Sequence, residues 1–169
     1  ARWFVAEATN GRLEGEWSGT PVNVAYLAAE ESAKYVVKPG MRAAGADLSR
    51  IFTPKVTFGG DEVRFLSSRD MAALTDHLLQ RGIRLVVVDP LMSTISGRSD
   101  INRNNEMREL LEPWAKLAEA IDGVALGVVH LNKSSNGDIV AGINGSSAFG
   151  EVARATFGFA KDPESAAGP

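Results

Sequence analysis

The stretch Arg84-Leu85-Val86-Val87-Val88-Asp89-Pro90 decides the fold class of this 169-residue chain. A continuous aliphatic run with three valines in a row is typical of strands that a parallel sheet buries on both faces. The run ends in an aspartate and a proline, which marks the end of the strand. The stretch therefore predicts a central strand of an α/β domain.

Further strands and helices alternate along the chain on both sides of this stretch. Buried strands are predicted at 22–27 and 124–129, and shorter ones at 51–58, 63–66 (on either side of a Gly59-Gly60 turn) and 155–160. Helices are predicted at 1–13, 28–44, 68–79 and 107–121, with Pro39 and Gly40 bending or interrupting the second. The alternation predicts right-handed crossovers and a three-layer α/β fold with a mostly parallel central sheet.

The composition limits the possible functions. The absence of cysteine excludes disulfides, thiolate metal sites and cysteine nucleophiles. Only two histidines occur, His77 and His130, so a histidine-rich metal site is not expected, and we interpret His77 as structural. No apolar run approaches the roughly 20 residues of a membrane span, and the N-terminus lacks the order of an export signal, so we expect a cytoplasmic location and no membrane partner. A net charge of −3 gives no general attraction to nucleic acid, so any DNA contact would be local, on a loop.

Three polar residues stand where predicted strands end, and parallel sheets bind ligands beyond the carboxyl ends of their strands. These residues are Glu30, Asp89 and His130. Asp89 follows four aliphatic residues and could hold a magnesium ion, directly or through water. Alternatively, Asp89 caps the following turn, with Pro90 at the first central position of that turn.

The other candidates also have two interpretations each. Glu30 could accept the proton of an attacking water, or it could lie with Glu31 in the first turn of a helix, which fits Glu31 better. His130 could sense a terminal phosphate, or it could be a structural histidine. Lys133 lies in a glycine-rich polar segment that either contacts a nucleic-acid backbone or is a solvated loop. Arg154 could reach a phosphate across a subunit interface, or it could pair with Glu151.

Several segments, taken in order, resemble the RecA-like ATPases of the family that contains the hexameric RepA-type plasmid helicases. The resemblance covers nearly the whole chain. It rests on the order and spacing of 22–31, 42–50, the Walker B-like strand 84–91, 128–134, 145–149 and Ala153-Arg154.

The resemblance implies a function, cofactors and partners. The family is one of ATP-dependent, ring-forming DNA motors that use ATP and magnesium. The implied partners are single-stranded DNA and further copies of the chain, which would form a hexamer. The resemblance implies that Glu30 is the catalytic glutamate, and that Asp89 is the magnesium partner with Glu31 as a second cofactor-binding carboxylate. It also implies that His130 is a γ-phosphate sensor and Arg154 an arginine finger. The segment 131–147 would be a DNA-facing loop, with DNA contacts from Lys133, Ser134, Ser135 and Asn144.

The sequence departs from this family at one point. The G-x-x-x-x-G-K-[ST] phosphate-binding loop does not occur in the 169 residues. We expect residues 1–169 to form a partial RecA-like core that lacks the N-terminal phosphate-loop strand, has a frayed tail at 162–169, and does not hydrolyse ATP by itself. One alternative is a RecA-like module that oligomerises or binds nucleotide or DNA without hydrolysis. A third is an unrelated α/β enzyme that uses Glu30, Asp89 and His130 around a metal or a sugar phosphate.

Overall fold

A four-stranded parallel sheet forms the centre of the computed structural model, which describes residues 1–28, 31–55, 57–58, 61–62, 68–95, 104–130 and 148–159. The strand order is β2-β1-β5-β6. The strands are β1 (Asn23–Ala28), β2 (Ile51–Phe52), β5 (Ile83–Asp89) and β6 (Val124–Gly127). All three pairings in this sheet are parallel, which confirms the predicted fold class.

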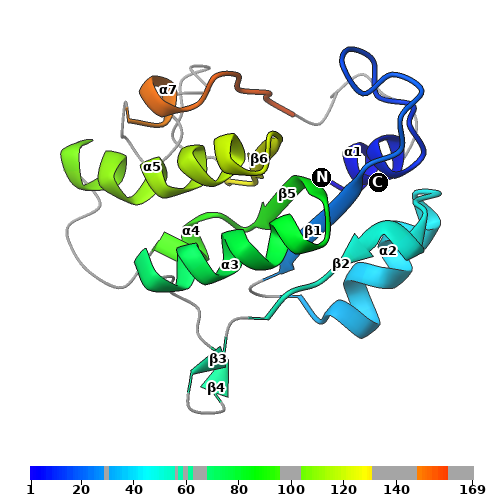
Figure 1. Ribbon diagram of the computed structural model, residues 1–169, viewed down its shortest axis with the longest axis horizontal. Coiled ribbons are helices and arrows are strands. Elements are labelled where there is room, and N and C mark those ends of the chain that lie inside the picture. Colours follow the sequence, from blue (N-terminus) through cyan, green and yellow to red (C-terminus); the bar gives the residue numbers. More distant parts are fainter. Residues whose placement is uncertain are drawn as a thin grey trace.

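Helices cover both faces of the sheet, so the domain has three layers (Figure 1). Alternate residues of β1 and β5 point to opposite faces, because successive side chains of a strand alternate. Ala25, Leu27, Val86 and Val88 belong to the core of one face, whereas Val24, Tyr26, Leu85 and Val87 belong to the core of the other. The predicted central strand is therefore buried on both sides, and Val86, Val87 and Val88 are at most 1% exposed.

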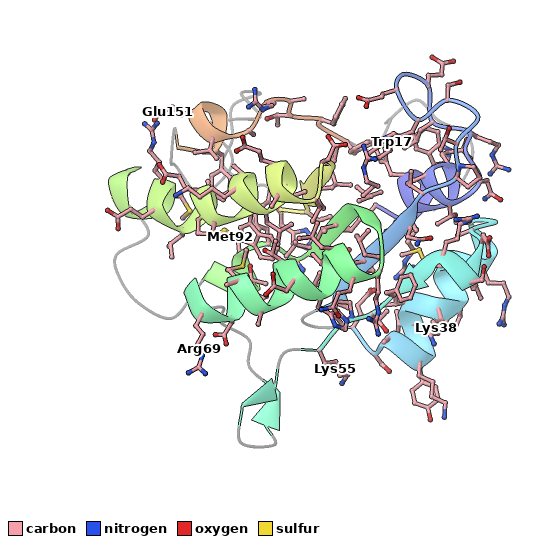
Figure 2. All side chains as sticks on the ribbon, viewed as in Figure 1. Trp17, Lys38, Lys55, Arg69, Met92 and Glu151 are labelled. Atoms are coloured by element: carbon pink, nitrogen blue, oxygen red, sulfur yellow. The ribbon has the colours of Figure 1, made fainter. Side chains whose placement is uncertain are left out.

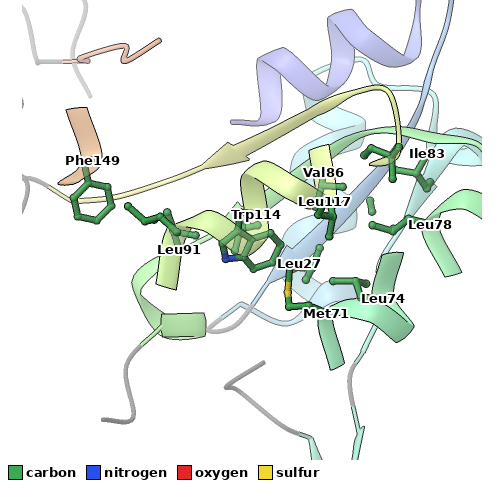
Figure 3. Close-up of a cluster of buried hydrophobic side chains, with 14 of the residues drawn as sticks. Leu27, Met71, Leu74, Leu78, Ile83, Val86, Leu91, Trp114, Leu117 and Phe149 are labelled. Carbon is green, nitrogen blue, oxygen red and sulfur yellow. The ribbon is translucent and has the colours of Figure 1, made fainter. Parts of the chain in front are cut away.

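The larger core lies between the sheet and three helices (Figure 3). These are α3 (Ser68–Gln80), α5 (Asn104–Ala120) and α7 (Ala148–Val152). The helical spacing of Met71, Leu74 and Leu78 directs one stripe of α3 at the sheet, as the sequence predicted. Five residues of α5 and the turn after it pack in the same way: Met107, Leu111, Trp114, Leu117 and Ile121.

The smaller core lies between the other face of the sheet and the first helices of the chain. These are α1 (Arg2–Thr9), a π-helical turn η1 (Ala33–Val37) and α2 (Lys38–Ala43). The predicted helix at 28–44 is thus two shorter helices that meet at Lys38, because Pro39 suits a helix start better than a helix interior. Charged side chains such as Lys38, Lys55 and Arg69 are exposed on the outside of these layers (Figure 2).

Small elements connect the main ones. A 3₁₀ turn, η2 (Leu48–Arg50), precedes β2, and a short helix, α4 (Met92–Ile95), follows β5. The predicted strand at 51–58 is two pieces, β2 and β3 (Thr57–Phe58). The second piece pairs antiparallel with β4 (Asp61–Glu62) in a hairpin that projects from the domain (Figure 1). The Gly59-Gly60 turn and the predicted strand at 63–66 lie outside the described residues.

Two predictions about the end of the chain are wrong. The strand predicted at 124–129 ends at Gly127 and is not buried on both faces, since Val124 is 46% exposed and β6 is an edge of the sheet in the described part of the chain. Residues 155–159 do not form the predicted last strand, and residue 160 is not described. A strand needs a neighbour for its backbone hydrogen bonds, and apolar sequence alone does not provide one.

Across the described ranges, no helix has both the length and the apolar character required to cross a membrane.

Candidate functional site

The carboxyl ends of the central strands lie together along one border of the sheet. This border is called the carboxyl edge below and is distinct from the edge strands β2 and β6. Ala28 of β1 is in register with Asp89 of β5, and the amide of Val128, just after β6, donates to the carbonyl of Val88 at 2.9 Å. The strands are parallel, so the residues that follow β1, β5 and β6 leave the sheet at this same edge. The sequence predicted a site here, and the structure places Asp89 at the centre of the edge.

Asp89 is the last residue of β5 and is half-buried. Its Oδ2 atom accepts a hydrogen bond from the hydroxyl of Tyr26 on the neighbouring strand. Tyr26 itself is 1% exposed and belongs to the core under α1 and α2. The carboxylate is therefore held on one side by a buried hydroxyl, as a half-buried charge requires.

The environment of Tyr26 keeps its hydroxyl protonated. Burial is the main cause that raises the pKa of the Tyr26 phenol above its ordinary value of 10.0. The hydrogen bond to Asp89 and the negative charges of Asp89 and Glu31 raise this pKa further. Tyr26 is consequently a hydrogen-bond donor across the physiological pH range.

This shift predicts a loss of stability at alkaline pH. The pKa of Tyr26 is higher in the folded chain than in the unfolded chain, so its contribution to stability is complete below pH 10 and is lost as the pH rises toward the folded value. Because a single proton is involved, the free energy of unfolding falls by at most about 1.4 kcal/mol for each pH unit. Urea unfolding between pH 8 and about 11.5 measures this decline. The decline should persist in Tyr35→Phe, which alters an exposed tyrosine on η1, and shrink in Tyr26→Phe. An equal decline in both variants would contradict the assignment.

Glu31 lies at the same edge but has a different partner. It precedes Ser32, the N-cap of η1, so the interpretation that places it in the first helical turn is wrong. Its Oε2 atom pairs with the guanidinium of Arg2 at 2.7 Å, and both side chains are partly exposed. This ion pair places the beginning of α1 beside the carboxyl edge of the sheet. A pair this exposed contributes little stability, about 0–1 kcal/mol.

The structure describes only some of the remaining candidate residues. His130 is exposed and follows β6 by three residues, and Arg154 is exposed and follows α7 by two residues. The alternative partner of Arg154, Glu151, forms an ion pair with Arg108 of α5 at 3.6 Å. Five further candidates lie outside the described residues: Glu30, Lys133, Ser134, Ser135 and Asn144.

A magnesium ion is compatible with the donor chemistry of Asp89. Among the described residues, no group of three or more acidic or histidine side chains is close enough to form a metal cage. Magnesium does not need such a cage, because it usually keeps several waters and takes one or two carboxylates together with substrate phosphates. A single fixed carboxylate at a strand end suits that mode of binding.

Sequence reasoning missed two residues of this edge, Tyr26 and Arg2. A tyrosine inside an otherwise apolar buried strand is a signal in itself, because its hydroxyl must find an acceptor. The sequence does not reveal which acceptor, since Tyr26 and Asp89 are 63 positions apart. The pair of Arg2 and Glu31, 29 positions apart, gives no comparable signal.

The layers, the strand order and the strand-end carboxylate define a RecA-like α/β domain. The chain belongs to the AAA domain family, whose family model matches residues 3–136. This membership is inconsistent with the third alternative, an unrelated α/β enzyme.

Two of the solved structures that share this fold illustrate the similarity. One is described as the ATPase domain of G40P, with a TM-score of 0.58 and 15% identity over 90% of this chain. The other is a DnaB-like replicative helicase described with its interactions with primase, with a TM-score of 0.56 and 13% identity over 90% of this chain. The chain spans 62% and 43% of these two structures. No curated protein matches the sequence.

Proposed function

We propose that this chain is the core of an ATP-dependent, ring-forming motor that acts on DNA in replication or recombination in the cytoplasm. The observation that carries the proposal is the Asp89 carboxylate, fixed at the carboxyl edge of a RecA-like sheet and in register with Ala28, two residues before Glu30. This is the edge at which α/β sheets bind their ligands. The fold similarity to a DnaB-like replicative helicase supports the same class of function.

The proposal gives each candidate residue a role. Asp89 would hold magnesium, directly or through water, with Glu31 nearby as a second carboxylate. Magnesium, when bound, neutralises charge on the phosphates of ATP. Glu30 would accept a proton from the attacking water, and His130 would report the terminal phosphate. Arg154, exposed beyond α7, would act on the nucleotide of a neighbouring subunit in a hexamer.

The loop at 131–147 would contact single-stranded DNA in this proposal. Lys133 would pair with phosphates, and Ser134, Ser135 and Asn144 would donate hydrogen bonds to the backbone. Such contacts position nucleic acid without reading its sequence. They agree with a chain whose net charge of −3 provides no general attraction to DNA.

Nucleotide binding also needs a cradle for the triphosphate, and the 169 residues do not contain the usual motif. Two observations support room for such a cradle beside the candidate site. The edge of β6 carries no further strand within the described residues, and the beginning of α1 lies beside the site through the pair of Arg2 and Glu31. A further parallel strand, followed by a phosphate-binding loop, would fit this arrangement.

Calorimetry with magnesium and ATP tests the proposal. The 169-residue chain is expected to bind ATP at least 100-fold more weakly than the complete gene product, because each 1.4 kcal/mol of lost phosphate contacts is a factor of ten. DNA-stimulated hydrolysis should appear in the complete gene product alone. If neither protein binds ATP, the motor proposal fails, and the absent motif then favours a RecA-like module that assembles without hydrolysis.

A further inference from the structure

The hydroxyl of Tyr26 joins the two central strands at the candidate site. Tyr26 lies on β1 and Asp89 ends β5, and these strands are adjacent and parallel. The hydroxyl donates to Oδ2 of the Asp89 carboxylate. This is a contact between a core residue and the carboxylate that the proposed function names as the main magnesium partner.

The core fixes the position of the Tyr26 ring. Its neighbours in the core under α1 and α2 include Val5, Val37, Met41 and Val87, each of which is fully buried. Side chains in such close-packed surroundings have few alternative rotamers. The ring therefore delivers its hydroxyl to one place, and that place is the carboxylate at the edge of the sheet.

We propose that Tyr26 is a positioning residue for the metal site, and that its hydroxyl holds Oδ2 of Asp89 so that Oδ1 is left for the ion or for a water bound to it. This inference rests on the proposed function, because it takes Asp89 as the magnesium partner. Groups that orient the ligands of a metal commonly change metal affinity by about 10–100-fold when they are lost.

Tyr26 has a matched control in the same chain. The chain contains two tyrosines, and the other one, Tyr35, is 74% exposed on η1. Its ring contacts the ammonium of Lys34 and does not belong to either core. Tyr35→Phe therefore removes the same atom as Tyr26→Phe without touching the carboxylate.

The first test measures metal affinity without turnover. Manganese(II) is titrated into the complete gene product with saturating ADP, and the free ion is followed by electron paramagnetic resonance. Tyr26→Phe is expected to raise the dissociation constant of manganese at least about 10-fold. Tyr35→Phe is expected to leave it unchanged. The affinity for ADP without metal should be the same in both variants, which separates metal positioning from a general loss of structure.

Asp89→Asn distinguishes failure of this inference from failure of the proposed function. If Asp89→Asn leaves manganese affinity unchanged, Asp89 is not the metal partner and the site assignment itself is wrong. If Asp89→Asn weakens manganese binding and Tyr26→Phe does not, the assignment stands and the positioning role of Tyr26 is refuted.

A second test needs neither metal nor nucleotide. In the Tyr35→Phe background Tyr26 is the sole tyrosine, so its phenol C–O stretch can be observed alone by ultraviolet resonance Raman spectroscopy. Asp89→Ala removes the acceptor and is expected to shift this band. An unshifted band would show that the hydroxyl does not hold the carboxylate and would overturn the inference.

Discussion

Glu30→Gln is expected to lower ATP hydrolysis by the complete gene product about 10²–10⁴-fold, while magnesium and ATP still bind. The substitution keeps the size and polarity of the side chain but removes its ability to accept a proton. A group that takes a proton from the attacking water acts in the transition state and contributes little to ground-state binding, so the turnover number should fall and the binding constant should not. Steady-state hydrolysis together with calorimetric titration of magnesium and ATP measures both quantities.

Variants of two other glutamates serve as comparisons for Glu30→Gln. Glu119→Gln alters an exposed carboxylate near the end of α5 and should leave hydrolysis unaffected. Glu31→Gln weakens the pair with Arg2 at 2.7 Å and should have a much smaller effect than Glu30→Gln. If Glu31→Gln abolished hydrolysis and Glu30→Gln did not, the roles of the two carboxylates would be the reverse of those proposed.

The central part of the fold could be predicted from the sequence because its signals are local. Four aliphatic residues before Asp89 specify a strand buried on both faces, and the spacing of Met71, Leu74 and Leu78 specifies a helix above it. Each signal is contained in a short stretch of sequence and does not depend on the structure of the rest of the chain. The layers follow, since alternating strands and helices have few ways to pack.

The two errors about strands concern features that depend on a neighbouring strand. β6 has the same apolar sequence pattern as a central strand, but its exposure depends on whether another strand lies beside it. Residues 155–159 have strand-like sequence and form no strand for the same reason. Which strands pair, and at which edge, is a property of topology that a local window of sequence does not contain.

The candidate site also has one part that the sequence predicts and one part that it does not. Asp89 could be predicted because a polar residue at the end of a buried strand marks the ligand-binding edge. Its link to Tyr26 could not, because that link depends on the register of β1 against β5, in which Ala28 faces Asp89. Register is set by packing across the whole strand.

Gly123→Ala is expected to destabilise the fold by about 3 kcal/mol or more, the upper part of the range for overpacked sites. Gly123 joins α5 to β6 directly after Asp122, which has a φ of 47°. A Cβ atom at Gly123 would lie 2.1 Å from the carbonyl oxygen of Arg84 and 2.8 Å from its carbonyl carbon. Both atoms belong to the backbone of β5, so relief requires the central strand or the turn to move.

Gly127→Ala provides the comparison, because it places a methyl group at the other end of the same strand. Its nearest neighbour would be the Cδ2 atom of Leu91 at 2.6 Å, which is the far end of a side chain, so a small movement of that side chain relieves the contact without moving a strand. The expected cost is about 1 kcal/mol. Urea unfolding of both variants, with the slope of the transition unchanged, gives the two values. Equal costs would show that the turn after α5 can shift, and that the close approach of Gly123 to Arg84 does not fix β5 against β6.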